Sequence, residues 1–341
     1  MKRPASAATT RLRRALPVPA EPPVNEIDNT FDLQDGAPAP REEVLPDGAV
    51  LCRAPAKLNL SLRVAGVRDD GFHELDSVVA KITFYDELTL RLRDDGGITL
   101  ACEGLDCGSD ADNLALRAAR ALRAAVPDRE GADIRLVKRI PPGTGLGGGS
   151  SDAAAVLWTL NRLWGLNLPA DRLSAAGAEL GSDVPLFLGP PASRMRGRGE
   201  LIEPVVLPPF RVLLCLPDLL CPTGPVYAAW DALQGAQGDL AGRPEHAAWE
   251  ARLEAGRVSD PPSAWRGELV NDLLPAAEVV LPDLRGWSKR LAAATGLPVH
   301  MTGSGCGLFV LLDDAHGVRD ALANMPPEMR SRCVLARANP W

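Results

Sequence analysis

A glycine-rich stretch that runs straight into an apolar, helix-forming segment is the feature of this chain that points most directly to chemistry. The stretch reads PPGTGLGGGSS, and five of the seven residues from 143 to 149 are glycine. Glycine lacks a Cβ, so backbone N–H groups can converge on an anion. A helix that begins directly after such a loop adds unpaired N–H groups and the positive end of its dipole. The sequence therefore predicts a phosphate-binding loop built from Gly143, Gly145, Gly147, Gly148 and Gly149.

Two serines and an apolar helix face follow the loop. Ser150 and Ser151 place hydroxyl groups where the loop meets the helix, and we expect them to contact a phosphate or a Mg²⁺ ion. The helix is expected to be anchored in a core, because apolar residues recur at helical spacing: Ala153, Val156, Leu157, Leu160, Leu163 and Trp164. A rigid phosphate site is favoured over a flexible loop with a serine N-cap, since loops seldom concentrate glycine so strongly beside a helix start.

Two common phosphate-binding loops do not fit this stretch. A Walker A loop ends in Gly-Lys-Ser/Thr, and no lysine follows Gly149. The Rossmann fingerprint needs a different glycine spacing and an acidic residue at the end of the following strand. The glycine-rich stretch therefore matches neither the Walker A loop nor the Rossmann fingerprint.

If the predicted phosphate loop serves phosphoryl transfer, Asp183 is a candidate proton acceptor. It lies in LGSDVP, between a helix stop at Gly181 and the Val184-Pro185 pair. Phosphoryl transfer to an alcohol requires positioning, charge stabilisation and a group that accepts the hydroxyl proton. The alternative role of Asp183 is an N-cap for the segment VPLFL, and the two roles do not exclude each other.

Hydrophobic periodicity predicts the elements that position these residues. In APAKLNLSLRV, Leu58 and Leu60 alternate with Lys57 and Asn59, which predicts a strand with one buried face. We also expect a helix capped by Asp110 or Asp112. The predicted strands cover residues 54–64, 76–95 (one long strand or two), 132–140, 210–218 and the apolar part of 297–314 that follows its glycine-rich turn. The predicted helices cover 110–126, 150–164 (from the serine pair at the end of the loop) and 169–181.

The chain is expected to divide into an extension and two domains. Residues 1–46 are rich in Ala, Pro, Thr and Arg and have no acidic residue before Glu21. They lack a secretory apolar segment, so we expect a disordered tail, with an organelle transit peptide as the alternative. The pattern changes past Pro204, which predicts domains at 47–205 and 206–341.

Composition excludes several functional classes. The chain has 341 residues, 46% of them hydrophobic, and a net charge of −7. That charge argues against a nucleic-acid partner, and no apolar run approaches the ~18 residues of a membrane helix. The seven cysteines form no C-x-x-C pair, and their number is odd. We expect reduced thiols in a cytoplasmic protein.

The segment PPGTGLGGGSSDAA resembles the nucleotide-binding motif of the GHMP kinases, the superfamily of galactokinase, homoserine kinase and mevalonate kinase. Further segments resemble the same superfamily: APAKLNLSLRVAGVRDDGFHELDSV, AELGSDVPLFL with RGRGE, and MTGSGCGLFVLL. The resemblance covers roughly 50–340 and is weakest across 228–266. It implies an α+β fold, with a ribosomal-protein-S5-like N-terminal domain and a ferredoxin-like C-terminal domain.

The segments GFHEL and LGSDVP narrow what the resemblance implies about the reaction. The expected reaction is ATP-dependent phosphorylation of the 2-hydroxyl of 4-diphosphocytidyl-2-C-methyl-D-erythritol, in the non-mevalonate route to isoprenoids. Asp183 would be the base. Lys57 would stabilise charge on the attacking oxygen, although a lone lysine on a strand is ordinarily solvated. Asn59 shares its strand face and would also reach the substrate.

The resemblance also implies a cytosine pocket. His73 would hydrogen-bond the base, with Phe72 and Tyr227 stacking on its two sides. The family usually has tyrosine at the position of Phe72, so a phenolic contact there would be lost. An exposed histidine and a core tyrosine are the structural alternatives. Thr223 is a weaker candidate for a substrate contact.

For ATP, the resemblance implies contacts along the loop, including Pro141 and Leu146, and near Asn113 and Lys138. Lys138 has the alternative of a solvated strand-end lysine. No acidic metal site is evident, which suits Mg²⁺ carried mainly by the nucleotide and water. The loop TGSGCG, residues 302–307, would close the site from the second domain, with Cys306 as a packing residue.

Other outcomes remain open at this point. The chain would be a monomer or a homodimer. Another GHMP kinase, of the homoserine or mevalonate type, would need no cytosine pocket. A non-catalytic ligand sensor of the same fold is disfavoured, because Asp183, Lys57 and the glycine loop are all present.

Overall fold

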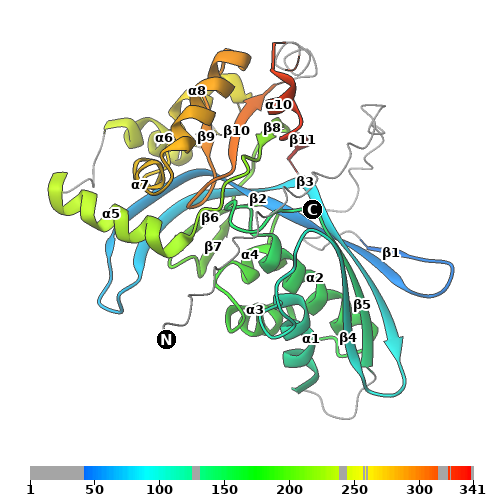
Figure 1. Ribbon diagram of the computed structural model, residues 1–341. Coiled ribbons are helices and arrows are strands. Elements are labelled where there is room, and N and C mark those ends of the chain that lie inside the picture. Colours follow the sequence, from blue (N-terminus) through cyan, green and yellow to red (C-terminus); the bar gives the residue numbers. More distant parts are fainter. Residues whose placement is uncertain are drawn as a thin grey trace, which may run out of the picture. The chain divides into compact units, whose positions relative to one another are not determined.

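The computed structural model describes residues 42–124, 131–237, 244–255, 258, 260–313, 322 and 324–338 (Figure 1). Most of the predicted extension lies outside these residues. Its end differs from the prediction, because Glu42–Val44 form strand β1, which pairs antiparallel with Val50–Cys52. Glu42 also accepts a hydrogen bond of 2.6 Å from the Thr159 hydroxyl. The folded chain therefore begins before residue 47.

The first sheet holds the long strands that carry Lys57 and Asn59. Its order is β1-β2-β3-β5-β4, with β6 pairing with β3 and β7 pairing with β6. Only β4 and β5 are parallel among these pairs. The bounds are β2 Val50–Val67, β3 His73–Arg93, β4 Ile98–Gly104, β5 Gly131–Lys138, β6 Ala192–Gly197 and β7 Leu201–Pro204.

Strand β2 is buried on both faces, so the prediction of a single buried face is wrong. Leu58 and Leu60 lie in a hydrophobic cluster, as expected. Lys57 and Asn59 on the other face are only 5% and 3% exposed. Loops from distant parts of the chain cover that face. Strand β3 is one continuous element of 21 residues, which resolves the choice between one strand and two.

A second, fully antiparallel sheet has the order β11-β8-β10-β9. Its strands are β8 Arg211–Cys215, β9 His300–Met301, β10 Leu308–Leu312 and β11 Cys333–Arg337. The two sheets and their helices give the predicted α+β class. None of the described helices combines the length and the apolar character needed to span a bilayer.

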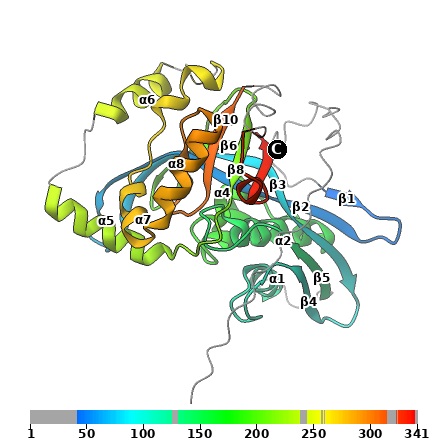
Figure 2. The same ribbon diagram turned by 45° about the horizontal axis from the view of Figure 1, so that its top comes forward.

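The helices gather in two groups, which Figures 1 and 2 show from two directions. One group packs with β4 and β5 in a single hydrophobic cluster: α1 Leu114–Ala124, α2 Gly148–Leu163, α3 Ala170–Ala178 and α4 Val184–Leu188. The other group follows β8 in the chain: α5 Thr223–Gln237, α6 Pro244–Glu254, the 3₁₀ turns η2 Pro262–Ala264 and η3 Arg266–Glu268, α7 Leu274–Val280, α8 Asp283–Thr295 and α10 Pro327–Arg330.

Two hydrophobic clusters join residues from both sides of the predicted boundary at 205. Leu62 of β2 belongs to a cluster with Leu213 and Leu308 of the second sheet. Leu58 belongs to another with Val212 and Phe309. The sheets change between β7 and β8, where the boundary was placed, but their cores are shared. The division at 205 stays a prediction.

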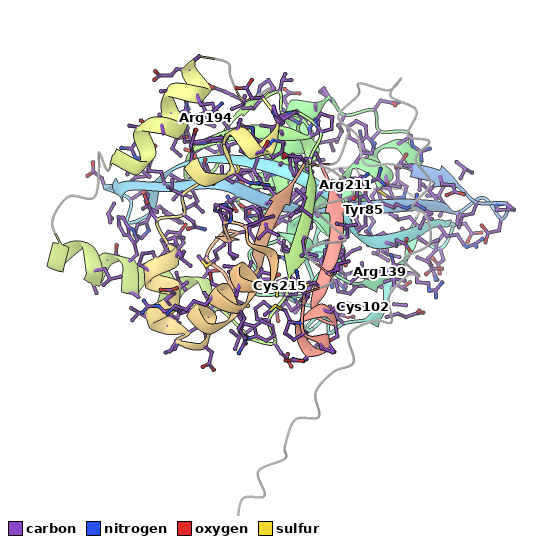
Figure 3. All side chains as sticks on the ribbon, turned by 90° about the horizontal axis from the view of Figure 1, so that it is seen from above. Tyr85, Cys102, Arg139, Arg194, Arg211 and Cys215 are labelled. Carbon is purple, nitrogen blue, oxygen red and sulfur yellow. A yellow bond between two sulfur atoms is a disulfide. The ribbon has the colours of Figure 1, made fainter. Side chains whose placement is uncertain are left out.

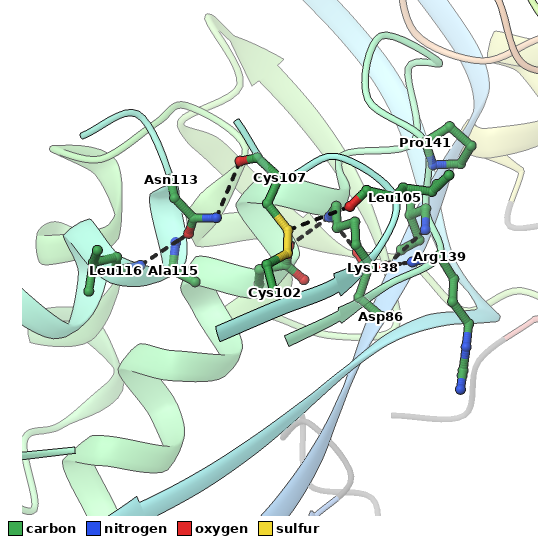
Figure 4. Close-up of polar contacts among 12 residues, drawn as sticks. Asp86, Cys102, Leu105, Cys107, Asn113, Ala115, Leu116, Lys138, Arg139 and Pro141 are labelled. Atoms are coloured by element: carbon green, nitrogen blue, oxygen red, sulfur yellow. Dashed lines mark hydrogen bonds and ion pairs between the residues drawn. A yellow bond between two sulfur atoms is a disulfide. The ribbon is translucent and has the colours of Figure 1, made fainter. Parts of the chain in front are cut away.

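The cysteines differ from expectation at one pair. Cys102 on β4 and Cys107 form a disulfide, with Cα atoms 6.6 Å apart (Figure 4), so the prediction of seven reduced thiols is wrong there. The other five are free, including Cys215 on β8, which Figure 3 labels together with Cys102. Cys306 is buried and donates to the carbonyl of Leu219 at 3.0 Å, in keeping with a packing role.

His300 on β9 makes stability depend on pH. Its ring lies 5.4 Å from that of Phe309, and its Nε2 is buried with no partner among the described residues. Burial lowers the pKa of His300 to about 4, although a hydrogen bond with the Arg266 backbone opposes the shift. The unfolded chain takes up the proton near its ordinary value of 6.5. Stability is therefore full above pH 6.5 and falls as the pH drops toward 4, by up to about 3 kcal/mol.

The test is urea unfolding of the wild type and His300→Leu between pH 7.5 and 4. We expect the variant to gain on the wild type as the pH falls, because leucine cannot be protonated. Parallel stability curves for the two proteins would contradict the role of His300.

Candidate active site

The glycine loop is shaped by three glycines with positive φ. The values are +70° at Gly143, +74° at Gly145 and +71° at Gly147, a region that side chains other than glycine rarely adopt. A Cβ on Gly145 would lie 2.2 Å from the carbonyl oxygen of Thr302, and one on Gly147 would lie 2.9 Å from the Phe187 ring. Glycine is therefore required here both for backbone conformation and for close approach.

Helix α2 begins with an open N-terminus. Its N-cap, Gly147, makes no side-chain cap, and the first turn carries no acidic residue. The first N–H groups of a helix have no intrahelical partner, so they are available to an anion. Ser150 is partly exposed, and Ser151 is buried with a hydroxyl that lacks a partner among the described residues. This arrangement is suited to phosphate oxygens.

Lys138, at the end of β5, forms ion pairs with Asp86 of β3 and with Asp152 of α2, the helix that follows the glycine loop. Its ammonium group donates 2.5 Å to Asp86 and 2.6 Å to Asp152, as Figure 4 shows for Asp86. Asp86 also accepts hydrogen bonds from the backbone N–H groups of Arg139 and Ile140. Burial disfavours the charge, but the two carboxylates together raise the pKa of Lys138. The alternative of a solvated lysine is wrong, because the side chain is buried in ion pairs.

Asn113 caps helix α1. Its side-chain oxygen accepts hydrogen bonds from the N–H groups of Ala115 at 3.0 Å and Leu116 at 3.2 Å (Figure 4). The expected caps, Asp110 and Asp112, do not take this place. An asparagine at the N-cap satisfies helix donors as well as aspartate does.

Lys57 and Asp183 come together, as predicted from two distant segments. Lys57 Nζ lies 4.0 Å from Asp183 Oδ2 and donates 2.5 Å to Asn59 Oδ1. Burial lowers the pKa of Lys57, and the Asp183 carboxylate partly offsets this. The backbone N–H of Lys57 donates 2.9 Å to the carbonyl of Leu146, which ties the strand to the glycine loop.

Asp183 keeps its carboxylate free of a capping role. It stands at the N-cap position of α4, but its side chain makes no cap hydrogen bond. The side chain is 32% exposed, enough for a substrate hydroxyl to approach. Burial raises the pKa of Tyr227 to about 12, and the charge of the Asp183 carboxylate makes a smaller contribution in the same direction. Tyr227 is therefore within electrostatic range of the base candidate.

The loop from 302 to 307 meets the glycine loop, as expected. The Gly307 N–H donates 3.1 Å to the Thr144 carbonyl, and the Thr302 hydroxyl accepts from the Asn59 N–H at 3.0 Å. Thr223, at the start of α5, lies 3.0 Å from Ser304, hydroxyl to hydroxyl. The two glycine-rich loops are therefore joined by a direct backbone hydrogen bond.

The predicted aromatic pocket is formed in part. His73 and Tyr227 have ring centroids 4.6 Å apart, and His73 lies 5.4 Å from Trp230. Asp231 hydrogen-bonds the His73 Nε2 at 2.8 Å. Phe72 does not share these ring contacts in the described part of the chain. The Phe72 residue is 54% exposed, and its ring centroid lies 4.9 Å from the Arg198 guanidinium carbon.

Sequence reasoning identified Tyr227 but missed Trp230, Asp231 and Asn271. Trp230 and Asp231 lie three and four residues after Tyr227 on α5, a spacing in PVYAAWD that places all three on one helix face. Asn271 donates to the carbonyls of Met301 at 2.8 Å and Gly303 at 2.9 Å, and so holds the second loop. No sequence pattern points to Asn271, since its partners are 30 and 32 residues away.

The described residues contain no group of three or more His, Cys, Asp or Glu side chains arranged to hold a metal ion. The hydroxyls of Ser150 and Ser151 stand at the start of α2, and the buried Ser151 hydroxyl lacks a partner among the described residues. Hydroxyl oxygens are hard donors that would suit a Mg²⁺ ion carried by a nucleotide.

Residues 113–189 of this chain match the family model of the GHMP kinases N terminal domain. A 4-diphosphocytidyl-2-C-methyl-D-erythritol kinase of Variovorax paradoxus is 41% identical over 280 residues, covering 82% of this chain and 92% of the relative.

Solved structures agree with that match. A crystal structure of 4-(cytidine 5'-diphospho)-2C-methyl-D-erythritol kinase superposes with a TM-score of 0.68 at 35% identity, covering 84% of this chain and 98% of that one. Mevalonate kinase of L. major reaches a TM-score of 0.64 at 14% identity, covering 84% and 95%, which shows a shared fold alone.

Proposed function

The chain belongs to the family of 4-diphosphocytidyl-2-C-methyl-D-erythritol kinases, within the GHMP kinases, and from this we propose that it transfers the ATP γ-phosphoryl group to the 2-hydroxyl of 4-diphosphocytidyl-2-C-methyl-D-erythritol. That reaction belongs to the non-mevalonate route to isoprenoid precursors. The observation that carries the proposal is the pairing of Lys57 and Asp183, 4.0 Å apart, beside the glycine loop, where a Cβ on Gly147 would lie 3.2 Å from Lys57 Cγ.

In the proposed step, the oxygen of the substrate 2-hydroxyl attacks the γ-phosphorus, and the Asp183 carboxylate accepts the proton of that hydroxyl. The new O–P bond forms while the bond from the γ-phosphorus to the β,γ-bridging oxygen breaks, and ADP leaves. The Lys57 ammonium stabilises the negative charge on the attacking oxygen. Asn59 holds that ammonium at 2.5 Å, so the lysine needs little reorganisation during the reaction.

The glycine loop is proposed to bind the ATP phosphates through the first N–H groups of α2, with contacts from Pro141 to Ser151. Mg²⁺ would be carried by the phosphates and water, with the hydroxyls of Ser150 and Ser151 beside it, and would neutralise phosphate charge. Lys138 would act on ATP through the loop it supports, since both carboxylates already occupy its ammonium. Asn113 would act in the same way through the start of α1.

The aromatic pocket is proposed to bind cytosine, with His73 hydrogen-bonding the base and Tyr227 stacking on it. Asp231 would fix the ring orientation of His73. Thr223 would reach the substrate from the start of α5. We further propose a cytoplasmic location and a monomer or homodimer as the working form.

The function is tested by an ATP-consumption assay with purified protein, Mg²⁺ and 4-diphosphocytidyl-2-C-methyl-D-erythritol. Homoserine and mevalonate serve as control acceptors. We expect turnover with the cytidyl substrate only. Turnover with a control acceptor would keep the superfamily and reject the cytosine pocket, whereas ATP binding with no turnover of any acceptor would favour a ligand sensor.

Replacing Tyr227 by leucine should weaken binding of the cytidyl substrate. Stacking of a base on an aromatic ring contributes about 1–3 kcal/mol, so we expect KM for this substrate to rise roughly 5- to 100-fold. KM for ATP should change little. Steady-state kinetics at varied cytidyl substrate and fixed ATP measure the effect.

Phe72→Leu is the matched control, because its ring lies against Arg198 and outside the His73–Tyr227 pair. Its effect on KM should be several-fold smaller. A larger effect at Phe72 than at Tyr227 would show that the base stacks on Phe72 instead.

A further inference from the structure

Lys81 is a buried lysine that the proposed reaction does not use. It lies on β3, directly opposite Lys57 of β2 in the strand register, and is 3% exposed. Its ammonium group donates 2.7 Å to the carbonyl of Gly189 and 3.1 Å to that of Phe187. Both acceptors lie at the C-terminal end of α4. The backbone N–H of Lys81 also donates 2.8 Å to the carbonyl of Pro191, just beyond them.

A lysine is a costly residue at this position. Among the described residues no carboxylate forms an ion pair with it, and burial lowers the pKa of Lys81 to about 7. A charged group without a counter-ion is rarely kept inside a protein, because an apolar residue of similar size avoids the desolvation penalty. Its contacts with the helix end are therefore the feature that distinguishes lysine from methionine or leucine here.

Helix α4 connects this lysine to the candidate base. Asp183 stands immediately before the helix, which is only five residues long. The Gly189 N–H donates hydrogen bonds to the carbonyls of Pro185 and Leu186 within the helix. The carbonyls of Phe187 and Gly189 accept hydrogen bonds from the Lys81 ammonium group. A cation at the C-terminal end also matches the helix dipole. In so short a helix, the end held by Lys81 cannot move without moving Asp183.

The same helix contacts the phosphate loop. The Phe187 ring is so close to Gly147 that a Cβ there would lie 2.9 Å away. Lys57 and Lys81 lie on adjacent strands and on the same face of the sheet, so the pairing of β2 with β3 fixes their relative positions. Lys57 contacts Asp183, and Lys81 contacts the helix that follows Asp183.

We propose that Lys81 is a positioning residue: by binding the C-terminal end of α4, its ammonium group fixes Asp183 relative to Lys57 and the acceptor hydroxyl. This inference rests on the proposed function, since it assigns Lys81 a role in the same reaction. Lys81 touches neither reacting atom. Its contribution is made through the helix, and a displacement of about 1 Å at a reacting group can cost on the order of 100-fold in rate.

The test compares Lys81→Met, which has a similar shape and no charge, with Lys81→Arg, which keeps a cation. We expect kcat of Lys81→Met to fall roughly 10- to 100-fold, with the melting temperature within a few degrees of the wild type because the buried charge is gone. KM for ATP should change less than about threefold. Lys81→Arg should recover part of kcat. Lys289→Met, at an exposed lysine on α8, is the control and should keep the wild-type rate.

A double mutant separates positioning of Asp183 from a general loss of structure. In an Asp183→Asn background, Lys81→Met should lower kcat no further, because residues that act through one group are not additive. A multiplicative loss would overturn the inference, as would an unchanged kcat in Lys81→Met. A drop in melting temperature that accompanies the loss of rate, with no rescue by arginine, would also overturn it.

The same measurements distinguish this inference from the proposed function. If the wild-type chain fails to turn over the cytidyl substrate, the function is rejected and the inference with it. If the wild type is active and Lys81→Met equals it, only the inference is rejected.

Discussion

Replacing Asp183 by asparagine is expected to lower kcat by about 10²- to 10⁴-fold, the usual contribution of a general base. Asparagine has nearly the same shape and cannot accept the hydroxyl proton as a carboxylate does. The start of α4 should be unaffected, because the Asp183 side chain makes no cap hydrogen bond that asparagine would have to replace. KM for ATP should therefore stay within about threefold of the wild type.

The measurement is steady-state turnover with the cytidyl substrate, with the fold checked by thermal melting. Asp171→Asn, in the exposed first turn of α3, is a charge-matched control and should leave kcat unchanged. Wild-type turnover by Asp183→Asn would remove Asp183 from the role of base. A rise in KM for ATP with kcat retained would instead indicate that its charge serves nucleotide binding.

Replacing Gly145 by alanine should disable the phosphate loop. The φ angle of +74° disfavours any side chain, at a cost of roughly 1–2 kcal/mol. In addition, the new Cβ would lie 2.2 Å from the Thr302 oxygen and 2.9 Å from its carbonyl carbon. Both are backbone atoms, so the contact can be relieved only by moving one of the two loops. We expect kcat/KM for ATP to fall by about 10²- to 10³-fold.

Gly149→Ala is the matched substitution in the same loop. Its φ is not positive, and the nearest atom to its Cβ is Leu114 Cδ1 at 3.7 Å, an ordinary contact. Alanine also favours the first turn of α2 by up to ~1 kcal/mol relative to glycine. ATP titrations of both variants should show a loss at least tenfold smaller for Gly149→Ala than for Gly145→Ala. Equal losses would mean that bulk anywhere in the loop is harmful and that the Thr302 contact is not decisive.

The parts of the site that sequence reasoning predicted are those encoded by contiguous residues. The glycine loop, the Asp183 turn and the strand of Lys57 each occupy a short segment with its own local pattern. Local patterns report backbone conformation, and the resemblance to the GHMP kinases assigned these segments to one site. In the structure, Lys57 and Asp183 lie 4.0 Å apart.

The parts that were missed depend on partners far away in the chain. The alternation around Leu58 and Leu60 predicted a solvent-facing side for β2, but Thr302, 243 residues from Asn59, covers it. Lys138 looked like a strand-end lysine because Asp86 lies 52 residues before it. Strand periodicity cannot reveal which loop covers a face, so burial of a polar residue is visible only in the folded chain.

The hydrogen bond from the Gly307 N–H to the Thr144 carbonyl has a consequence for biosynthesis. The glycine loop is translated long before its partner: 163 residues separate Thr144 from Gly307 (307 minus 144). At translation rates of roughly 5–20 residues per second, that interval lasts about 8 to 30 seconds. A nascent or truncated chain that ends before the second loop contains every strand of the first sheet, but it lacks the partner of Thr144 and the Phe309 side chain that shares a hydrophobic cluster with Leu58. The ability to consume ATP therefore arrives only when nearly the whole chain has been made.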